Sequence, residues 1–223
     1  MRPFTFILSL VAALVAGGAK GDGLSCAAGR VMIDAPNKTL ADQACRAVMT
    51  SLAAFETCGL PPPPPLQLTV TPTLNADCLG LFHCGENQIE VLTPDALNAA
   101  RPGLTVFGHI PGDRLFASVI HHELAHAVID ATPCPYGDCV ATSEYFAYTQ
   151  QIAALSDEDR ARIEARIPLD APPNRDSINP FMLYMAPERF ILTALAHFRT
   201  RPDACATWQG IAEGIILFDK LHP

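Results

Sequence analysis

The sequence is organised around one stretch, residues 113–130, which reads DRLFASVIHHELAHAVID. Its apolar residues recur at helical spacing and form two neighbouring stripes, and Pro133 follows shortly after the stretch ends. We therefore predict an amphipathic helix with Asp113 as its N-cap. In this helix His122 and His126 lie four residues apart, so both imidazoles project from the same face.

The segment His122-Glu123-Leu124-Ala125-His126 has the pattern H-E-x-x-H. Two imidazoles on one helical face can bind the same ion. The carboxylate of Glu123 lies between them, where it can take a proton from water held by that ion. At this composition the pattern is expected by chance in roughly one sequence of this length in a hundred. We interpret both histidines as metal ligands and Glu123 as the catalytic carboxylate; the alternative is ordinary core or surface histidines beside a coincidental glutamate.

A catalytic zinc site needs a third protein ligand and leaves one position open. The glycine and the third histidine of the longer motif H-E-x-x-H-x-x-G-x-x-H are missing, because Ile129 and Thr132 occupy their positions. Glu144 is the better candidate: it lies in the inner stripe of a predicted helix over 140–155, where an uncompensated carboxylate would be costly. Two aspartates remain alternatives for this role, Asp130 and Asp138.

The stretch from His122 to Asp130, followed by Ser143-Glu144-Tyr145-Phe146-Ala147, resembles the gluzincin group of zinc peptidases, to which thermolysin and the minigluzincins belong. These proteins carry H-E-x-x-H on one helix and E-x-x-A on the next. The resemblance covers residues 113–150. It implies a zincin-like fold, one Zn2+ per chain on His122, His126 and Glu144, and a peptide or protein substrate. It also implies an edge strand that pairs with the substrate, for which residues 88–92 are the candidate.

The outer part of the site departs from this family. Many gluzincins carry an acidic residue four positions after the glutamate ligand, and here that position holds Tyr148. We expect Asp130 or a backbone carbonyl to orient a zinc histidine instead. A donor to the developing oxyanion is also needed, and four residues remain open for this role: His197, Tyr184, Tyr148 and Tyr136. His121 is expected to point away from the metal.

Strand patterns precede helix patterns along the chain, which predicts an α+β fold. Strands are predicted over 66–71, 79–82 and 88–92, with a turn at 85–87. Helices are predicted over 37–56, 113–130, 140–155, 157–166, 187–200 and 202–215. Residues 94–112 and 170–180 are predicted to be irregular. We expect one zincin-like catalytic domain over 20–223, with a core over 66–155 and a helical part over 156–223.

The N-terminus predicts export. Arg2 precedes an apolar run from Phe4 to Val15, and small residues follow as far as Ala19, which is typical of a signal peptide over residues 1–19. The protein would then be periplasmic or secreted, with no stable membrane insertion after cleavage. Without Arg2 the chain has 14 basic and 23 acidic residues. This negative charge argues against a nucleic-acid partner.

Eight cysteines follow the signal sequence, and an even number in an exported chain predicts four disulfides. Cys134 and Cys139 are close enough in sequence to close a small loop. If residues 78–84 form a regular strand, Cys78 and Cys84 lie about 20 Å apart and cannot bond to each other.

The sequence therefore predicts an exported zinc metallopeptidase. Two other classes stay open. One is a catalytically inactive zincin-like protein used for binding or as a scaffold, and the other is a disulfide-rich structural domain without a metal. The substrate, the cleavage preference and the oligomeric state are left open.

Overall fold

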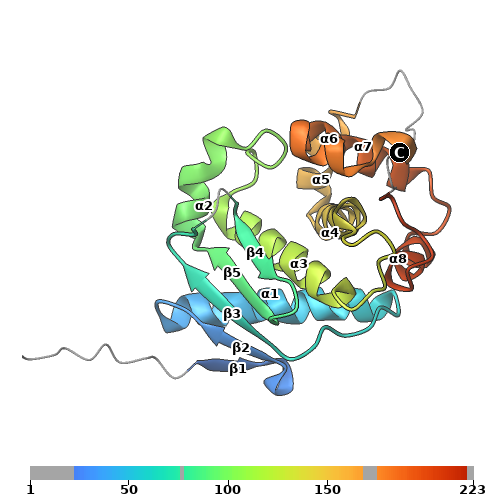
Figure 1. The fold of residues 1–223 in the computed structure, drawn as a ribbon. Coiled ribbons are helices and arrows are strands. Elements are labelled where there is room, and N and C mark those ends of the chain that lie inside the picture. Colours follow the sequence, from blue (N-terminus) through green and yellow to red (C-terminus); the bar gives the residue numbers. More distant parts are fainter. Residues whose placement is uncertain (1–22, 76–77, 168–174, 220–223) are drawn as a thin grey trace, which may run out of the picture.

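A computed structural model describes residues 23–75, 78–167 and 175–219 of the chain. The predicted signal peptide and part of the predicted loop over 170–180 lie outside these residues. The described chain is α+β, as predicted, and a mixed five-stranded sheet forms one side of it (Figure 1). The strands are β1 (Leu24–Cys26), β2 (Val31–Asp34), β3 (Leu66–Thr71), β4 (Gly80–His83) and β5 (Gln88–Leu92).

The strand order is β1-β2-β3-β5-β4. β2, β3 and β5 are parallel, and each outer strand is antiparallel to its neighbour. The three predicted strands are confirmed, whereas β1 and β2 were not predicted. The prediction that residues 88–92 form the edge was wrong, because β5 is hydrogen-bonded on both sides and β4 is the outer strand.

Two long helices pack against the sheet and against each other, α1 (Lys38–Thr57) and α3 (Gly112–Ile129) (Figure 1). Both confirm predicted helices. The prediction that Asp113 caps α3 was wrong, since the N-cap is Pro111 and Asp113 lies in the first turn. Part of the segment 94–112 is also helical, as α2 (Pro94–Ala100). Thr93 caps α2 and proline occupies its first position, two start signals that are visible in the sequence.

The second half of the chain is helical, as predicted, and lies across from the sheet (Figure 1). Its helices are α4 (Val140–Ala153), α5 (Asp157–Glu164), α6 (Pro180–Met185), α7 (Pro187–Arg199) and α8 (Ala204–Ala212). α6 was not predicted. α3 packs closely along α4, so it joins the two halves. No helix in the described part of the chain has the length and hydropathy that crossing a membrane would require.

Three disulfides join cysteines of the described residues: Cys26–Cys45, Cys58–Cys205 and Cys134–Cys139. The first ties β1 to α1, and the second ties the end of α1 to α8. The third closes the short loop between α3 and α4, as predicted. Four disulfides were expected from the even number of cysteines, but Cys84 is a free thiol. The three bonds fit an oxidising compartment.

Candidate metal centre

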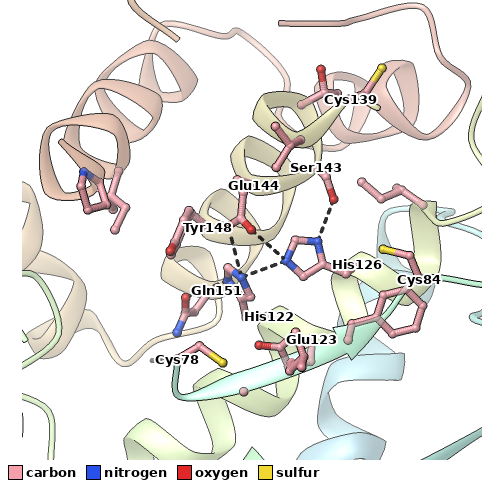
Figure 2. A pocket seen from close by; sticks show the side chains of 18 of the residues that line it. Cys78, Cys84, His122, Glu123, His126, Cys139, Ser143, Glu144, Tyr148 and Gln151 are labelled. Carbon is pink, nitrogen blue, oxygen red and sulfur yellow. Dashed lines mark hydrogen bonds and ion pairs between the residues drawn. The ribbon is translucent and has the colours of Figure 1, made fainter. Parts of the chain in front are cut away.

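Three predicted ligands come together between α3 and α4. The Nε2 atoms of His122 and His126 lie 3.0 Å apart, because one helical turn separates the two residues. The Glu144 carboxylate lies 3.5 Å from Nε2 of His122 and 3.6 Å from Nε2 of His126. Figure 2 shows the three side chains converging on one point. The structure thus gathers a group that could hold a metal ion.

The spacing of these donor atoms suits a small tetrahedral ion. Donors that lie about 2.0–2.2 Å from one ion in tetrahedral geometry are about 3.3–3.6 Å apart from each other. The two histidine nitrogens are 3.0 Å apart, and each has a different Glu144 oxygen near that range: Oε2 lies 3.5 Å from His122 Nε2 and Oε1 lies 3.6 Å from His126 Nε2. The residues present therefore fit a metal ion without rearrangement of either helix.

The outer nitrogens of both histidines are held by α4. Nδ1 of His122 lies 3.1 Å from the Gln151 side-chain oxygen, and Nδ1 of His126 lies 2.7 Å from the Ser143 hydroxyl. The Gln151 amide nitrogen in turn donates to Ser118, which orients its oxygen toward His122. Because the Gln151 oxygen can only accept, the His122 ring donates from Nδ1, and the Nε2 atoms of both rings face the ion position.

The expectation that Asp130 orients a zinc histidine was wrong. Its carboxylate accepts a hydrogen bond from the backbone N–H of Gly85 at 3.1 Å, at the rim of the cavity. Asp138 also lies at the cavity wall and is not part of the ligand group. The neutral side chains of Gln151 and Ser143 therefore orient the two histidines, a role that was expected of a carboxylate.

The charges of the ligand group are complementary to a cation. Burial alone would raise the pKa of Glu144, but the two histidines outweigh it and the pKa is lowered. Burial lowers the pKa of His126 to about 4. For His122 the hydrogen bond of Glu144, with the charges of Glu123 and Glu144, outweighs burial, so its pKa is raised. Without a metal, an ionised Glu144 is therefore balanced by a proton on His122.

Glu123 is buried between α3 and the edge strand β4. Its carboxylate accepts a hydrogen bond from the backbone of Phe82. It fits only because residue 80 is glycine: a Cβ at Gly80 would lie 2.6 Å from the Glu123 Oε1 atom. Burial raises the pKa of Glu123 to about 7, with His122 lowering it and Glu144 raising it. A carboxyl group with such a pKa can both accept and return a proton near neutral pH.

The ligand group opens into a cavity of about 890 Å³. One wall is the edge strand β4, and another is formed by α6 and the start of α7. Apolar side chains, including Val106, Phe107 and Ile191, line much of the remainder. Ligand pockets commonly have this size and this mixture of apolar walls and few polar groups.

Only two of the four candidate oxyanion donors line this cavity, Tyr148 and Tyr184. The Tyr148 ring packs against His122 with 4.6 Å between ring centroids. Burial, together with the charges of Glu144 and Glu123, raises the Tyr148 pKa. His197 was a wrong candidate, because it does not line the cavity, and its Nδ1 is paired with the Tyr145 hydroxyl at 3.0 Å.

Three residues of the site were missed by sequence reasoning: Gly80, Ser143 and Gln151. Gln151 follows Glu144 by seven residues, two helical turns, so helical spacing could have placed it on the same face. Ser143 is adjacent to Glu144 and carried no separate signal. The need for glycine at position 80 arises from the packing of β4 on α3, which no local pattern records.

The fold and the site define an α+β protein whose three converging side chains could hold a metal ion. Residues 31–221 match a family of unknown function, DUF6639, and the chain belongs to this family. No curated protein and no solved structure matches the chain.

Proposed function

We propose that this protein is an exported zinc-dependent metallopeptidase with a zincin-like fold. The observation that carries the proposal is the position of Glu123. Its side chain is only 6% exposed, it lies beside the ligand group at the cavity wall, and the glycine at position 80 makes room for it. A site that only binds a metal does not need this buried fourth residue.

The donor set favours zinc. Two imidazole nitrogens and one carboxylate are the protein ligands of many catalytic zinc sites, whereas calcium and magnesium prefer sites made of oxygen. His122, His126 and Glu144 would hold the ion. Bound there, zinc would lower the pKa of a water molecule and polarise the carbonyl group of a substrate.

The residues of the chain would divide the remaining work. Glu123 accepts a proton from the attacking water and passes it to the leaving amine. The raised pKa of Glu123 suits both transfers. Tyr148 supports the reaction by donating from its hydroxyl to the oxygen on which negative charge develops. Its raised pKa keeps that hydroxyl protonated.

The edge strand β4 would bind the substrate backbone. It pairs with β5 on one side only, and its other side lines the cavity. An extended peptide can add to such an edge by forming main-chain hydrogen bonds. We therefore assign to residues 80–83 the pairing with substrate that was expected of residues 88–92.

Export is supported by the signal-like N-terminus and by the three disulfides. Disulfides persist in the periplasm and outside the cell. A mature N-terminus near residue 20 in the protein recovered from the periplasm or the culture medium would support this part of the proposal. Recovery of the full-length chain from the cytoplasm would contradict it.

The function is tested by comparing the parent with Glu123→Gln on a quenched fluorescent peptide library, with bound zinc measured by elemental analysis. We expect about one zinc in both proteins and a 100-fold or greater loss of cleavage in the variant. Zinc binding without cleavage by the parent would favour a binding or scaffold protein. A parent that binds no zinc would rule out both.

A further inference from the structure

The first turn of α4 is held by the C-terminal segment of the chain. The Asp219 carboxylate accepts hydrogen bonds from the backbone N–H groups of Ala141 and Thr142, both at 2.9 Å. It also accepts a bond from the Thr142 hydroxyl at 2.7 Å. The backbone N–H of Phe218 donates to that same hydroxyl at 2.7 Å. Asp219 is only 3% exposed, so these bonds are shielded from water.

The Asp219 carboxylate takes the place of an N-cap side chain, which α4 lacks. The first N–H groups of a helix have no partner inside the helix, and a side chain at the N-cap commonly accepts from them. The N-cap residue of α4 is Cys139, whose side chain makes no capping bond and whose sulfur is in a disulfide. Asp219, far along the chain, supplies both the acceptor oxygens and a negative charge at the positive end of the helix.

The turn that Asp219 holds also carries one of the three candidate ligands and a residue that contacts another. Ser143, the next residue after Thr142, lies against Nδ1 of His126, and Glu144 is the third candidate ligand. A small rotation or fraying of this turn would therefore displace a ligand and the partner of another ligand together. His122 and His126, by contrast, lie in the buried middle of α3.

The C-terminal segment is itself anchored in the core. The Phe218 side chain is 1% exposed and stacks on Tyr145 of α4 with 4.1 Å between ring centroids. Leu217 lines the same cavity as the ligand group. Asp219 is therefore presented to α4 from a fixed position.

We propose that Asp219 is a positioning residue of the metal site, and that its contact with α4 raises the affinity of the protein for zinc. The inference rests on the proposed function only as far as metal binding and does not depend on peptide cleavage. Removing Asp219 deletes none of the three candidate ligands but releases the turn that aligns Glu144 and Ser143.

The test uses the mature protein with its disulfides intact and compares Asp219→Ala with Asp203→Ala. Asp203 is a matched control, because it caps α8 through a 2.9 Å bond from the backbone N–H of Ala206 and no residue of α8 belongs to the ligand group. The dissociation constant for zinc is measured by competition with a chromophoric chelator. Thermal unfolding of the metal-free proteins is recorded in parallel.

We expect Asp219→Ala to raise the dissociation constant for zinc at least about tenfold, the scale seen when groups that orient metal ligands are removed. Asp203→Ala should leave it within about twofold of the parent. Asp219→Asn, which keeps one acceptor oxygen, should restore part of the affinity. If Asp219→Ala does not fold, Thr142→Val takes its place, since it removes only the hydroxyl that links Asp219 and Phe218.

Unchanged zinc affinity in Asp219→Ala would overturn the inference, even if the variant unfolds at a lower temperature. Equal losses of affinity in Asp219→Ala and Asp203→Ala would also overturn it, because the effect would then follow general stability. A parent that binds zinc but cleaves no peptide would contradict the proposed peptidase activity and leave this inference intact. A parent that binds no zinc would contradict both the proposed peptidase activity and this inference.

Discussion

Two neighbouring histidine–glutamine pairs join α3 to α4, and they lie in different surroundings. Nε2 of His121 is 3.4 Å from the Gln150 side-chain oxygen, and its Nδ1 is 3.0 Å from the Ser51 hydroxyl on α1. Nδ1 of His122 is 3.1 Å from the Gln151 side-chain oxygen. Its Nε2 faces His126 and Glu144. The first histidine is engaged on both sides by uncharged side chains, whereas the second presents one nitrogen to the ligand group.

Surroundings, rather than residue type, therefore separate a structural histidine from a candidate ligand. Successive residues of a helix point about 100° apart, so His121 faces α1 while His122 faces the cavity. Burial lowers the pKa of His121 to about 4, and the ring stays neutral in the core. The same helix and the same pairing with glutamine thus serve packing on one side and the metal site on the other.

The largest effect that tests this contrast is the loss of zinc from His122→Ala. Removing one of three ligands leaves two donors, so we expect the zinc affinity to fall at least about 100-fold. Bound zinc, measured by elemental analysis after dialysis, should drop from about one per chain to nearly none. His121→Ala is the matched control and should keep its zinc. Equal zinc loss from the two variants would remove the distinction between the pairs.

The second effect concerns stability. His121→Ala should lower the free energy of unfolding by about 2–4 kcal/mol, because it opens a cavity, leaves the buried Gln150 oxygen without its partner and removes one of the two hydrogen bonds of the Ser51 hydroxyl. Urea unfolding of the metal-free protein measures this change. A variant as stable as the parent would show that the His121 pair contributes nothing to the core.

Local periodicity was sufficient to predict the elements that carry the ligands. The 3.6-residue repeat and the pattern H-E-x-x-H predicted α3, and the apolar stripe of the next helix singled out Glu144 before the structure placed it beside both histidines. The strands β3 and β5 were predicted from their alternation. The short strands β1 and β2, with three and four residues, contain too few residues for a period to be detected.

Contacts between distant parts of the chain could not be predicted in this way. Ser51 and His121 are 70 residues apart, and Asp219 lies 77 residues from Thr142. Each meets its partner only after the helices have packed, so neither has a local signature. The position of β4 at the sheet edge has the same cause, because strand order is a property of the whole fold.

A third effect should appear at the other end of α3, far from both histidine pairs. Arg114 donates to the Asp159 carboxylate at 2.8 and 3.1 Å, and Ser156 donates to it at 2.9 Å. Chiefly through Arg114, the pKa of Asp159 lies below its ordinary range although burial opposes this. The ionised form therefore stabilises the fold above about pH 4, and this contribution is lost as the pH falls through the lowered pKa.

Asp159→Asn should accordingly cost about 1–3 kcal/mol at neutral pH and less at pH 2–3. Asp157→Asn is the control, because the Asp157 side chain is 96% exposed and its ion pair with Arg160 should contribute little. Urea unfolding from pH 7 to pH 2 measures both. If the stability difference between Asp159→Asn and the parent did not shrink in acid, the ionised carboxylate would not be its source.

The smallest effect separates the two glutamines themselves. Gln151 holds the ring of His122 in the orientation that points Nε2 toward the ligand group, and Ser118 fixes the amide of Gln151. Gln151→Ala should therefore weaken zinc binding about tenfold, which corresponds to about 1.4 kcal/mol. Gln150→Ala should leave zinc binding unchanged. Gln150 pairs with His121 and does not belong to the ligand group, so its loss should not reach the zinc site. If both variants bound zinc as tightly as the parent, the Gln151 contact would contribute to packing alone, and the two pairs would differ only in that His122 presents Nε2 to the ligand group.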